Sequence, residues 1–253
     1  MAIDLPRRTL LGLAVASAAA ACTDTRNATP PTPATTPPLP RTPPLPRTTA
    51  PATGPATEVV RGSRGRNQVA LTFHGQGDPT IAAAVLDVLA AHHATGTVMA
   101  VGRWLAANPS MAATITAGGH ELGNHTWTHP DLASLPEPQI RAEIGRCRDT
   151  LVGLSGGPGN YFRQSSAQHS TALIRQVAGQ LGYLVCLSYD IDSLDWTDPG
   201  PAAIRRAVAG ATAGSIVSMH FGHQGTMAAL PAVLDDLAAR GLAPVTAATL
   251  LHA

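Results

Sequence analysis

The sequence has little charge of either sign and no basic block in its main region. Charged residues make up 13% of the 253 residues, and the formal net charge is +1 at pH 7. The one arginine cluster, at Arg61, Arg64 and Arg66, precedes that region. The chain therefore lacks the electrostatic signature of a nucleic-acid-binding protein, and we expect no nucleic acid partner. The apolar run at residues 10–21 is shorter than the roughly 20 residues of a transmembrane helix, which excludes it as a span in a mature protein.

Cysteine is also scarce, with three in the chain. Cys22 lies at the end of the N-terminal apolar run. Cys147 and Cys186 can pair in an oxidising compartment, and each also lies in an apolar-rich stretch where a buried thiol is ordinary. Their spacing leaves both alternatives open.

Residues 1–22 have the pattern of an export signal. Arg7 and Arg8 precede the apolar run, as in a twin-arginine signal. The sequence Ala-Ala-Ala-Cys at residues 19–22 is similar to a lipoprotein cleavage site, after which Cys22 would carry the lipid. We expect an exported protein, anchored through this lipid to the extracellular face of the cell membrane. Plain secretion, with cleavage after an Ala-x-Ala sequence, is the alternative.

Residues 23–66 are predicted to be a disordered linker. From residue 27 to about 58 the chain is nearly all proline, threonine and alanine, and Pro-Pro-Leu-Pro-Arg-Thr occurs at residues 37–42 and again at 43–48. No core can form from this composition, and proline-rich chains favour extended polyproline II structure. The segment is predicted to be a spacer that holds a domain away from a membrane or wall. A ligand for a proline-recognition domain is the alternative.

The remaining chain, residues 67–253, alternates between short β-rich runs and longer runs with helical spacing. Strands are predicted at residues 68–73, 96–101, 121–124, 160–163, 183–188, 215–220 and 243–245, and helices near 80–91, 109–117, 137–154, 171–181, 201–211 and 227–240. Repeated β-α order implies parallel strands with crossover helices. About seven such strands predict an α/β fold in the form of a closed or nearly closed (β/α) barrel. An open doubly wound sheet is the alternative.

Polar side chains follow the predicted strands. They are His74 and Asp78 after the first strand, His125 and His129 after the third, Arg163 at the end of the fourth, Asp190 and Asp195 after the fifth, and His220 at the end of the sixth. The C-terminal ends of the strands of such a barrel meet at one mouth, where its chemistry gathers. We therefore expect these side chains to converge.

His125 and His129 are four residues apart, which lets both imidazoles face one metal ion if the segment turns as a helix does. Around them, residues 119–132 read Gly-His-Glu-Leu-Gly-Asn-His-Thr-Trp-Thr-His-Pro-Asp-Leu. This stretch resembles, nearly residue for residue, the second motif of the polysaccharide deacetylases, the NodB-homology enzymes of carbohydrate esterase family 4. The other motifs of the family are similar to the sequences at residues 71–73, 162–163, 189–196 and 214–220.

The resemblance implies a distorted barrel of the NodB-homology type. It also implies a divalent metal, held by two histidines and an aspartate, and the removal of N-linked or O-linked acetyl groups from glycans. Matched by position, His125 and His129 would be metal ligands and His220 the general acid. Arg163 would orient the base, and Asp190 or Asp195 would tune His220.

The first motif departs from the family pattern, Thr-Phe-Asp-Asp-Gly-Pro, whose first aspartate is the base and whose second is a metal ligand. Residues 72–79 read Thr-Phe-His-Gly-Gln-Gly-Asp-Pro, so His74 takes the position of the base and Gly75 that of the ligand. In one repair, His74 is a third nitrogen ligand of a zinc site and Asp78 is the base. In the other, Asp78 binds the metal and His74 takes the proton.

The expected function is metal-dependent removal of acetyl groups from an acetylated polysaccharide, which would be peptidoglycan, chitin-like or xylan-like. Two alternatives stay open. The chain could be a glycan-binding barrel that lost catalysis together with the two carboxylates, or a metal-dependent amidase acting on a non-glycan substrate. The pattern predicts no particular oligomeric state.

Overall fold

The computed structural model describes residues 54–252. The predicted export signal at residues 1–22, with Cys22, and most of the predicted linker lie outside these residues. The strands are β1 (Thr57–Val59), β2 (Gln68–Gly75), β3 (Thr97–Ala100), β4 (Glu121–Asn124), β5 (Tyr161–Phe162), β6 (Val185–Leu187), β7 (Ile191–Asp192), β8 (Ile216–His220) and β9 (Ala243–Val245). The α-helices are α1 (Pro79–Ala91), α2 (Gly102–Ala107), α3 (Ser110–Ala117), α4 (Glu137–Ser155), α5 (Ala172–Gln180), α6 (Pro201–Val208), α7 (Gln224–Ala239) and α8 (Ala247–Leu251), and two 3-10 helices are η1 (Leu132–Ser134) and η2 (Asp195–Thr197).

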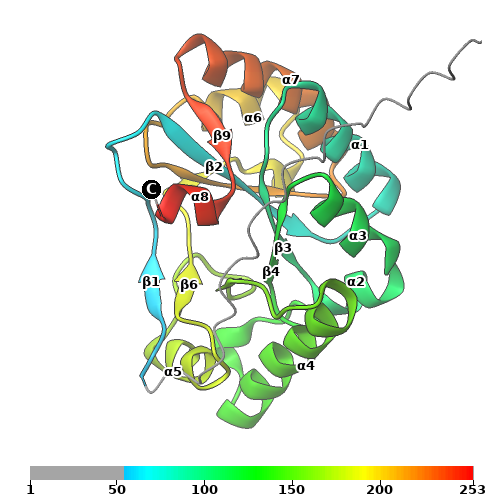
Figure 1. The fold of residues 1–253 in the computed structure, drawn as a ribbon, viewed down its shortest axis with the longest axis vertical. Helices are drawn as coiled ribbons and strands as arrows, with labels where there is room; N and C mark the ends of the chain where they lie inside the picture. Colours follow the sequence, from blue (N-terminus) through cyan, green and yellow to red (C-terminus); the bar gives the residue numbers. More distant parts are fainter. Residues whose placement is uncertain (1–53, 253) are drawn as a thin grey trace, which may run out of the picture. The chain divides into compact units, whose positions relative to one another are not determined.

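The strands form one nine-stranded sheet in the order β1-β6-β5-β4-β3-β2-β8-β7, with β9 also paired to β2. Every strand pairing is parallel. From β2 to β6 each strand lies beside the one before it in the chain, which is the winding of a barrel; a doubly wound sheet reverses direction midway. The sheet curls into a half-barrel with helices around it (Figure 1). The predicted (β/α) barrel is confirmed, and the alternative of an open doubly wound sheet is wrong.

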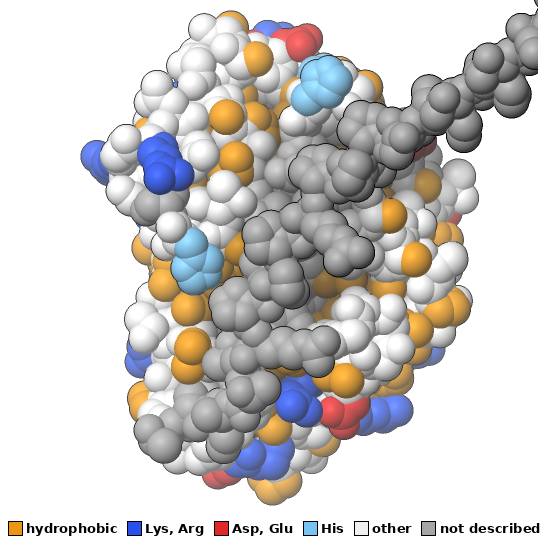
Figure 2. Space-filling model, in the orientation of Figure 1, with side chains coloured by type: hydrophobic (Ala, Val, Ile, Leu, Met, Phe, Trp, Pro, Cys, Tyr) orange, Lys and Arg blue, Asp and Glu red, His pale blue; other side chains and the backbone are white. Residues whose placement is uncertain are grey.

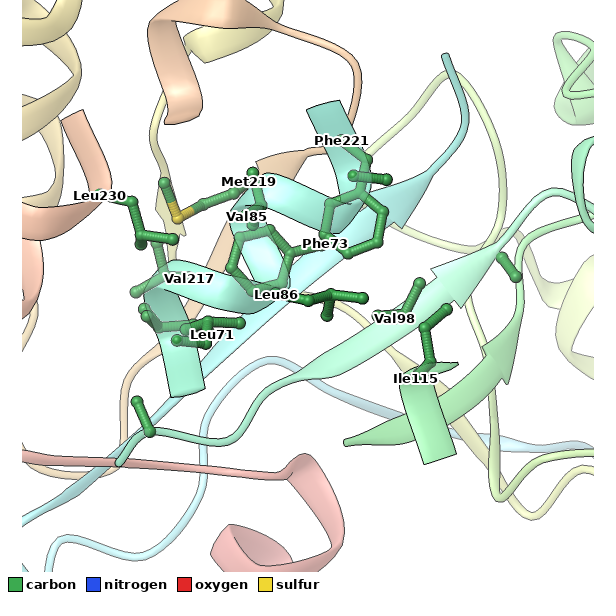
Figure 3. Packing of buried hydrophobic residues seen from close by; sticks show 14 of the residues in the cluster. Leu71, Phe73, Val85, Leu86, Val98, Ile115, Val217, Met219, Phe221 and Leu230 are labelled. Atoms are coloured by element: carbon green, nitrogen blue, oxygen red, sulfur yellow. The ribbon is translucent and has the colours of Figure 1, made fainter. Parts of the chain in front are cut away.

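Alternation along β2 separates the barrel interior from the helical layer. Val69, Leu71 and Phe73 are fully buried and belong to the main hydrophobic cluster. In Figure 3, Leu71 and Phe73 pack with side chains of α1, β3, α3, β8 and α7. The intervening residues, among them Ala70 and His74, point to the other face, because successive side chains of a strand alternate. The same alternation places Val217 and Met219 of β8 in the helical layer and His220 on the interior face.

The end of the barrel opposite the mouth is filled by apolar side chains and one buried carboxylate. Ala70, Met99 and Ile216 pack there with residues of α8. Glu121 begins β4 and is 8% exposed, and its carboxylate accepts hydrogen bonds from the Thr97 hydroxyl and the Ala248 backbone N–H. The C-terminal helix therefore closes this end of the barrel.

Strand β1 lies within residues 23–66, the predicted linker. It pairs with β6 and lies beside it in Figure 1. Arg61 then forms an isolated bridge with Ser215 at the start of β8. The segment therefore spans the gap between the two sides of the sheet, and the ordered domain begins before the predicted boundary at residue 67. A three-residue strand in a proline-rich context gives no periodic signal of its own, because its partners are supplied by distant parts of the chain.

The two cysteines in the described residues are free thiols and both are buried. Burial raises the pKa of Cys147 and of Cys186, each to about 12. The pairing of these residues, which their spacing left open, is absent, and both are inert core side chains.

Charges on the surface of the described region are dispersed in pairs. Along α4, Arg141 pairs with Glu137 and Arg148 with Asp149, and Figure 2 shows basic and acidic side chains side by side at the lower edge of this face. Among residues 54–252, the helices are all too short or too polar to cross a membrane.

Candidate active site

Four strand ends bring histidines and an arginine from distant parts of the chain to one mouth. His74 lies at the end of β2, His125 directly after β4, Arg163 directly after β5, and His220 at the end of β8. The ring of His74 lies 4.1 Å from that of His125 and 4.2 Å from that of His220, measured between centroids. His74, His125, Arg163 and His220, which the sequence predicted to converge, therefore do so.

His74, His125 and His129 form a group of potential metal ligands. One nitrogen from each of the three lies within 4.8 Å of the other two. Nδ1 of His125 is 3.0 Å from the carbonyl oxygen of Arg163, to which it donates its proton. Nε2 of His125 therefore carries a lone pair, and this buried atom has no hydrogen-bond partner among the described residues. An imidazole fixed on one side by a carbonyl, with its other nitrogen buried and unpaired, fits a metal ligand.

The segment that carries His125 and His129 is not helical. Thr126 has φ +67° and His129 has φ +62°, both in the left-handed region, which costs a non-glycine residue about 1–2 kcal/mol. The Asn124 side chain accepts from the Thr126 N–H, and the Thr126 hydroxyl accepts from the His129 N–H. These local bonds stabilise a tight turn, and the rings of the two histidines lie 4.8 Å apart. The sequence predicted that the imidazoles of His125 and His129 can face one metal ion if the segment is helical. In the structure a tight turn, and not a helix, brings the two rings together.

Arg163 is fully buried and holds His74. Nη1 of Arg163 donates to the Thr72 hydroxyl at 2.9 Å and contacts Nε2 of His74 at 3.2 Å. A guanidinium can only donate, so Nε2 of His74 is the acceptor. Neutral His74 therefore carries its proton on Nδ1, a buried atom with no partner among the described residues. The second ring nitrogen of His74 thus offers an N–H and not a lone pair.

Burial keeps these imidazoles neutral. The pKa of His74 is lowered well below its ordinary value, first by burial and then by the positive charge of neighbouring groups. Burial also lowers the pKa of His125 strongly and that of His129. Burial lowers the pKa of Arg163 to about 10, so the guanidinium stays charged at neutral pH. Neutral imidazole is the form of histidine that binds metals.

His220 and Asp195 form a buried hydrogen-bonded pair. Nδ1 of His220 is 2.7 Å from Oδ1 of Asp195, and the backbone N–H of His220 donates to Oδ2 at 2.8 Å. The hydroxyl of Thr226, in the first turn of α7, donates to the same Oδ2 at 2.6 Å. Burial alone would raise the pKa of Asp195, but the hydrogen bond and charge of His220 and the bond from Thr226 lower it. Asp195 is therefore ionised and fixes the proton of His220 on Nδ1.

Of the two aspartates offered as partners of His220, Asp195 contacts it and Asp190 does not. Asp190 accepts from Arg61, from the Ser215 hydroxyl and from the Ile216 N–H, so it joins the N-terminal segment to β8. The role of Thr226 was missed by sequence reasoning. Its position in an apolar helical run marks it only as a core residue.

Asp78 lies outside the group of potential ligands, although it was a candidate for ligand or base. Its side chain accepts from the Thr80 N–H at 2.8 Å and caps the N-terminus of α1. Asp is a preferred N-cap residue, and Pro79 at the first helical position strengthens the same signal. The helix start therefore explains Asp78 without any role in the site.

Gly75, at the position of the family's metal-binding aspartate, has no room for a side chain. A Cβ atom here would lie 2.9 Å from Val98, 3.1 Å from the Ala100 backbone and 3.3 Å from Trp104. Because β2 continues to Gly75, strand alternation turns position 75 towards the helical layer while His74 faces the mouth. Of positions 74 and 75 of the first motif, only 74 therefore supplies a side chain to the mouth.

Comparison with known families and curated proteins agrees with the motifs. Residues 61–186 match the family model described as polysaccharide deacetylase. The chain is 31% identical over 196 residues to a chitooligosaccharide deacetylase of Rhizobium leguminosarum bv. trifolii, which covers 71% of this chain and 89% of that protein. It is 29% identical over 180 residues to the peptidoglycan-N-acetylglucosamine deacetylase PgdA of Listeria monocytogenes. The matched region is 71% of this chain but spans only 38% of the length of PgdA.

A solved structure shares the fold. The protein BA3943 of Bacillus anthracis, described as a CE4 family pseudoenzyme, superposes with a TM-score of 0.72 at 23% identity. The match covers 77% of this chain and 68% of that protein. The shared fold is the barrel with its mouth at the C-terminal strand ends.

Proposed function

Because this chain belongs to the polysaccharide deacetylase family, we propose that it hydrolyses N-linked or O-linked acetyl groups of an acetylated polysaccharide, using a divalent metal, zinc, at the barrel mouth. The observation that carries the proposal is the arrangement around His74. Its ring lies between the His220–Asp195 pair on one side and the unpaired, buried Nε2 of His125 on the other. A proton carrier thus lies beside a potential metal site.

His125 and His129 would hold the metal. His125 is oriented by the carbonyl of Arg163 and presents its Nε2 lone pair, and His129 lies in the same ligand group. Bound there, zinc would act as a Lewis acid that polarises the acetyl carbonyl and lowers the pKa of a water molecule.

His220 would move the proton. Because Asp195 holds the proton on Nδ1, the singly protonated ring of His220 presents Nε2 as an acceptor. It would take a proton from the attacking water and return it to the leaving amine or alkoxide as the bond to the acetyl carbon breaks, with acetate as the other product. Asp195 would stabilise the imidazolium formed between these two steps.

His74 would act as a hydrogen-bond donor. Arg163 occupies its Nε2, so the Nδ1 proton is available to the acetyl oxygen as negative charge develops there. We prefer this assignment to the third ligand and to the base that the sequence suggested for His74, because each of those roles needs a lone pair on Nδ1, although His74 lies in the same distance group.

Peptidoglycan is the substrate that we propose first. The similar PgdA is named for peptidoglycan and the rhizobial relative for chitooligosaccharides, and both polymers carry N-acetylglucosamine. Trp196, which follows Asp195 and is 54% exposed, would stack on a sugar ring. The twin-arginine pattern and Cys22 support export and lipid anchoring at the extracellular face, with the proline-rich residues as the spacer.

The test measures metal content and acetate release together. The chain without its export signal is loaded with zinc and incubated with peptidoglycan, acetylated chitooligosaccharide and acetylated xylan. We expect one bound zinc and release of acetate from at least one polymer. His220→Ala should lower the rate by about 10²- to 10⁴-fold, the usual contribution of a general acid–base residue. His223→Ala, which removes a ring 5.9 Å from that of His220, is the matched control.

A glycan-binding barrel without catalysis is the second candidate, and the closed position at Gly75 favours it. A structural neighbour of this chain is itself described as a pseudoenzyme. Zinc uptake and polymer binding without acetate release from any of the three polymers would favour this candidate. Hydrolysis of a non-glycan acyl amide, with none of the polymers cleaved, would favour the amidase.

A further inference from the structure

The turn that carries His125 and His129 is attached to two helices through its backbone. The carbonyl oxygens of Thr126 and Trp127 accept from the backbone N–H groups of Gly102 and Arg103, both at 2.9 Å, at the start of α2. The N–H groups of the next positions point the other way, towards α4. The turn is therefore clamped between these two helices.

A single carboxylate of α4 accepts the hydrogen bonds of the backbone N–H groups on the α4 side of the turn. Oε2 of Glu143 accepts from the N–H of Trp127 at 2.9 Å and from the N–H of Thr128 at 2.7 Å. Its other oxygen, Oε1, accepts from the Thr128 hydroxyl at 2.8 Å. Hydrogen bonds to an ionised acceptor are stronger than neutral ones. Glu143 thus makes three bonds to the two residues that directly precede His129.

The next turn of α4 holds the side chain of Trp127. The guanidinium of Arg146 lies 4.4 Å above the Trp127 ring. A Cβ atom at Gly102 would lie 2.7 Å from Trp127 and 2.9 Å from the Cys147 backbone. The absence of a side chain at Gly102 therefore lets α2 and α4 close around the tryptophan, which fixes Glu143 relative to the turn.

The turn needs such support because it has no internal acceptors for these N–H groups. Thr126 and His129 both have positive φ, so the segment lacks the repeating bonds of a helix. Without the carboxylate, the N–H groups of Trp127 and Thr128 would lose the partners that they have in the described structure. The turn could then relax, and the first residue to be displaced is His129.

We propose that Glu143 is a positioning residue of the metal centre, which holds the His125–His129 turn in the geometry that binds the ion. Glu143 lies outside the group of potential metal ligands. It acts on His129 through the backbone of Trp127 and Thr128. The proposal rests on the proposed function in one respect, that this pair of histidines binds a metal.

Three variants of the full chain test it. Glu143→Ala removes all three bonds. Glu143→Gln keeps an oxygen for the two N–H groups and removes the charge. Glu137→Ala, the matched control, removes another glutamate of α4, whose partner is the exposed Arg141. Amide hydrogen exchange of Trp127 and Thr128, measured with a chelator present, reports the turn without any metal. Isothermal titration calorimetry with zinc measures the affinity of the metal site.

We expect Glu143→Ala to accelerate exchange at Trp127 and Thr128 and to weaken zinc binding by about 10- to 100-fold, as loss of a residue that orients a metal ligand does. Glu143→Gln should retain most of the exchange protection and most of the affinity, and Glu137→Ala should retain both in full. Unchanged exchange at these two amides in Glu143→Ala, or zinc affinity equal to that of the control, would overturn the proposal. If the wild-type chain bound no zinc, the proposed metal centre would fail, and the exchange data alone would decide whether Glu143 holds the turn.

Discussion

His74 shows how one hydrogen bond decides what a histidine can do in this site. Arg163 donates to Nε2, so the other ring nitrogen, Nδ1, carries the proton and cannot bind a cation in the neutral ring. In the proposed assignment, the three-histidine group defined by distance would therefore supply two ligands and one donor. Distances between nitrogens alone do not distinguish these roles, but the guanidinium does.

This assignment predicts unequal effects of alanine substitutions on metal binding. His125→Ala and His129→Ala should each lower zinc affinity by at least about tenfold, because each removes a direct ligand. His74→Ala should leave affinity within about threefold of wild type while lowering the rate of acetate release, since an oxyanion donor contributes about 10²- to 10³-fold. Calorimetry and acetate assays on the same preparations provide the comparison. A loss of zinc affinity in His74→Ala equal to that in His125→Ala would restore the third-ligand interpretation.

Position 75 is closed by packing as well as by the absence of a carboxylate. Gly75→Ala should destabilise the fold by about 1–3 kcal/mol, the usual cost of forcing an extra group into a packed core. Gly75→Asp should cost more, because its carboxylate would enter the apolar layer around Val98 and Trp104. Urea unfolding of the two variants measures both costs. A Gly75→Asp protein as stable as wild type, with raised zinc affinity, would show that the strand end can turn this side chain into the mouth.

The sequence predicts much of this site but not its hydrogen bonding. Motif positions identified His125, His129 and His220, and the ends of parallel strands explain why they meet. The choice of Asp195 over Asp190 could not be made, because both follow the same predicted strand. For Asp78 the sequence could not separate two explanations, because an aspartate before a proline suits a helix cap as well as a site. Strand alternation would have predicted that position 75 points away from the mouth, had the strand been predicted to extend past Phe73.

At the scale of elements, the fold was predictable wherever an element has a period of its own. The strands at 121–124 and 243–245 and the long helices were found within a few residues. Strands β1 and β7, of three and two residues, and the short helices α2 and α8 were not. Their formation depends on partners far away in the chain, and so short a segment shows no alternation.

Strand β1 provides a prediction about where the domain begins. Within the segment before residue 67, Ala56 is buried, Glu58 accepts from the Ser170 N–H, and Arg61 pairs with Asp190 and bonds to Thr212. A chain that begins at residue 67 loses these contacts together with the pairing to β6. It should be less stable than a chain that begins at residue 54 by on the order of 3 kcal/mol or more, at about 1 kcal/mol for each lost hydrogen bond.

Urea unfolding of the two chains measures this difference, and Arg61→Gln in the longer chain is the control. It removes the partly exposed ion pair with Asp190 and the bonds to Thr212 and the Ala213 carbonyl but keeps β1 and its pairing, so it should cost about 1–2 kcal/mol, less than the truncation. Equal unfolding free energies for the two chains would mean that residues 54–66 do not contribute to the stability of the barrel.

For the whole molecule, the buried histidines make stability depend on pH. Their folded pKa values lie below the ordinary 6.5, strongly so for His74 and His125 and less for His120 and His129, in each case mainly through burial. As pH falls through 6.5, the unfolded chain binds protons at these residues and the folded chain does not. The unfolded state is then favoured, so stability present above this pH is lost below it.

We expect the unfolding free energy to fall between pH 7.5 and 5.5, with a limiting slope of about 1.4 kcal/mol per pH unit for each of His74 and His125. Below this range Asp195, whose folded pKa is lowered, contributes a loss of the same sign as the unfolded chain takes up its proton. Glu121, whose folded pKa is raised by burial, contributes the opposite sign. Urea unfolding with a chelator present measures this pH dependence. His125→Gln should lower its slope by the amount that corresponds to one proton. A curve that is flat from pH 7.5 to 5.5 would mean that the mouth admits enough water to protonate these rings in the folded state.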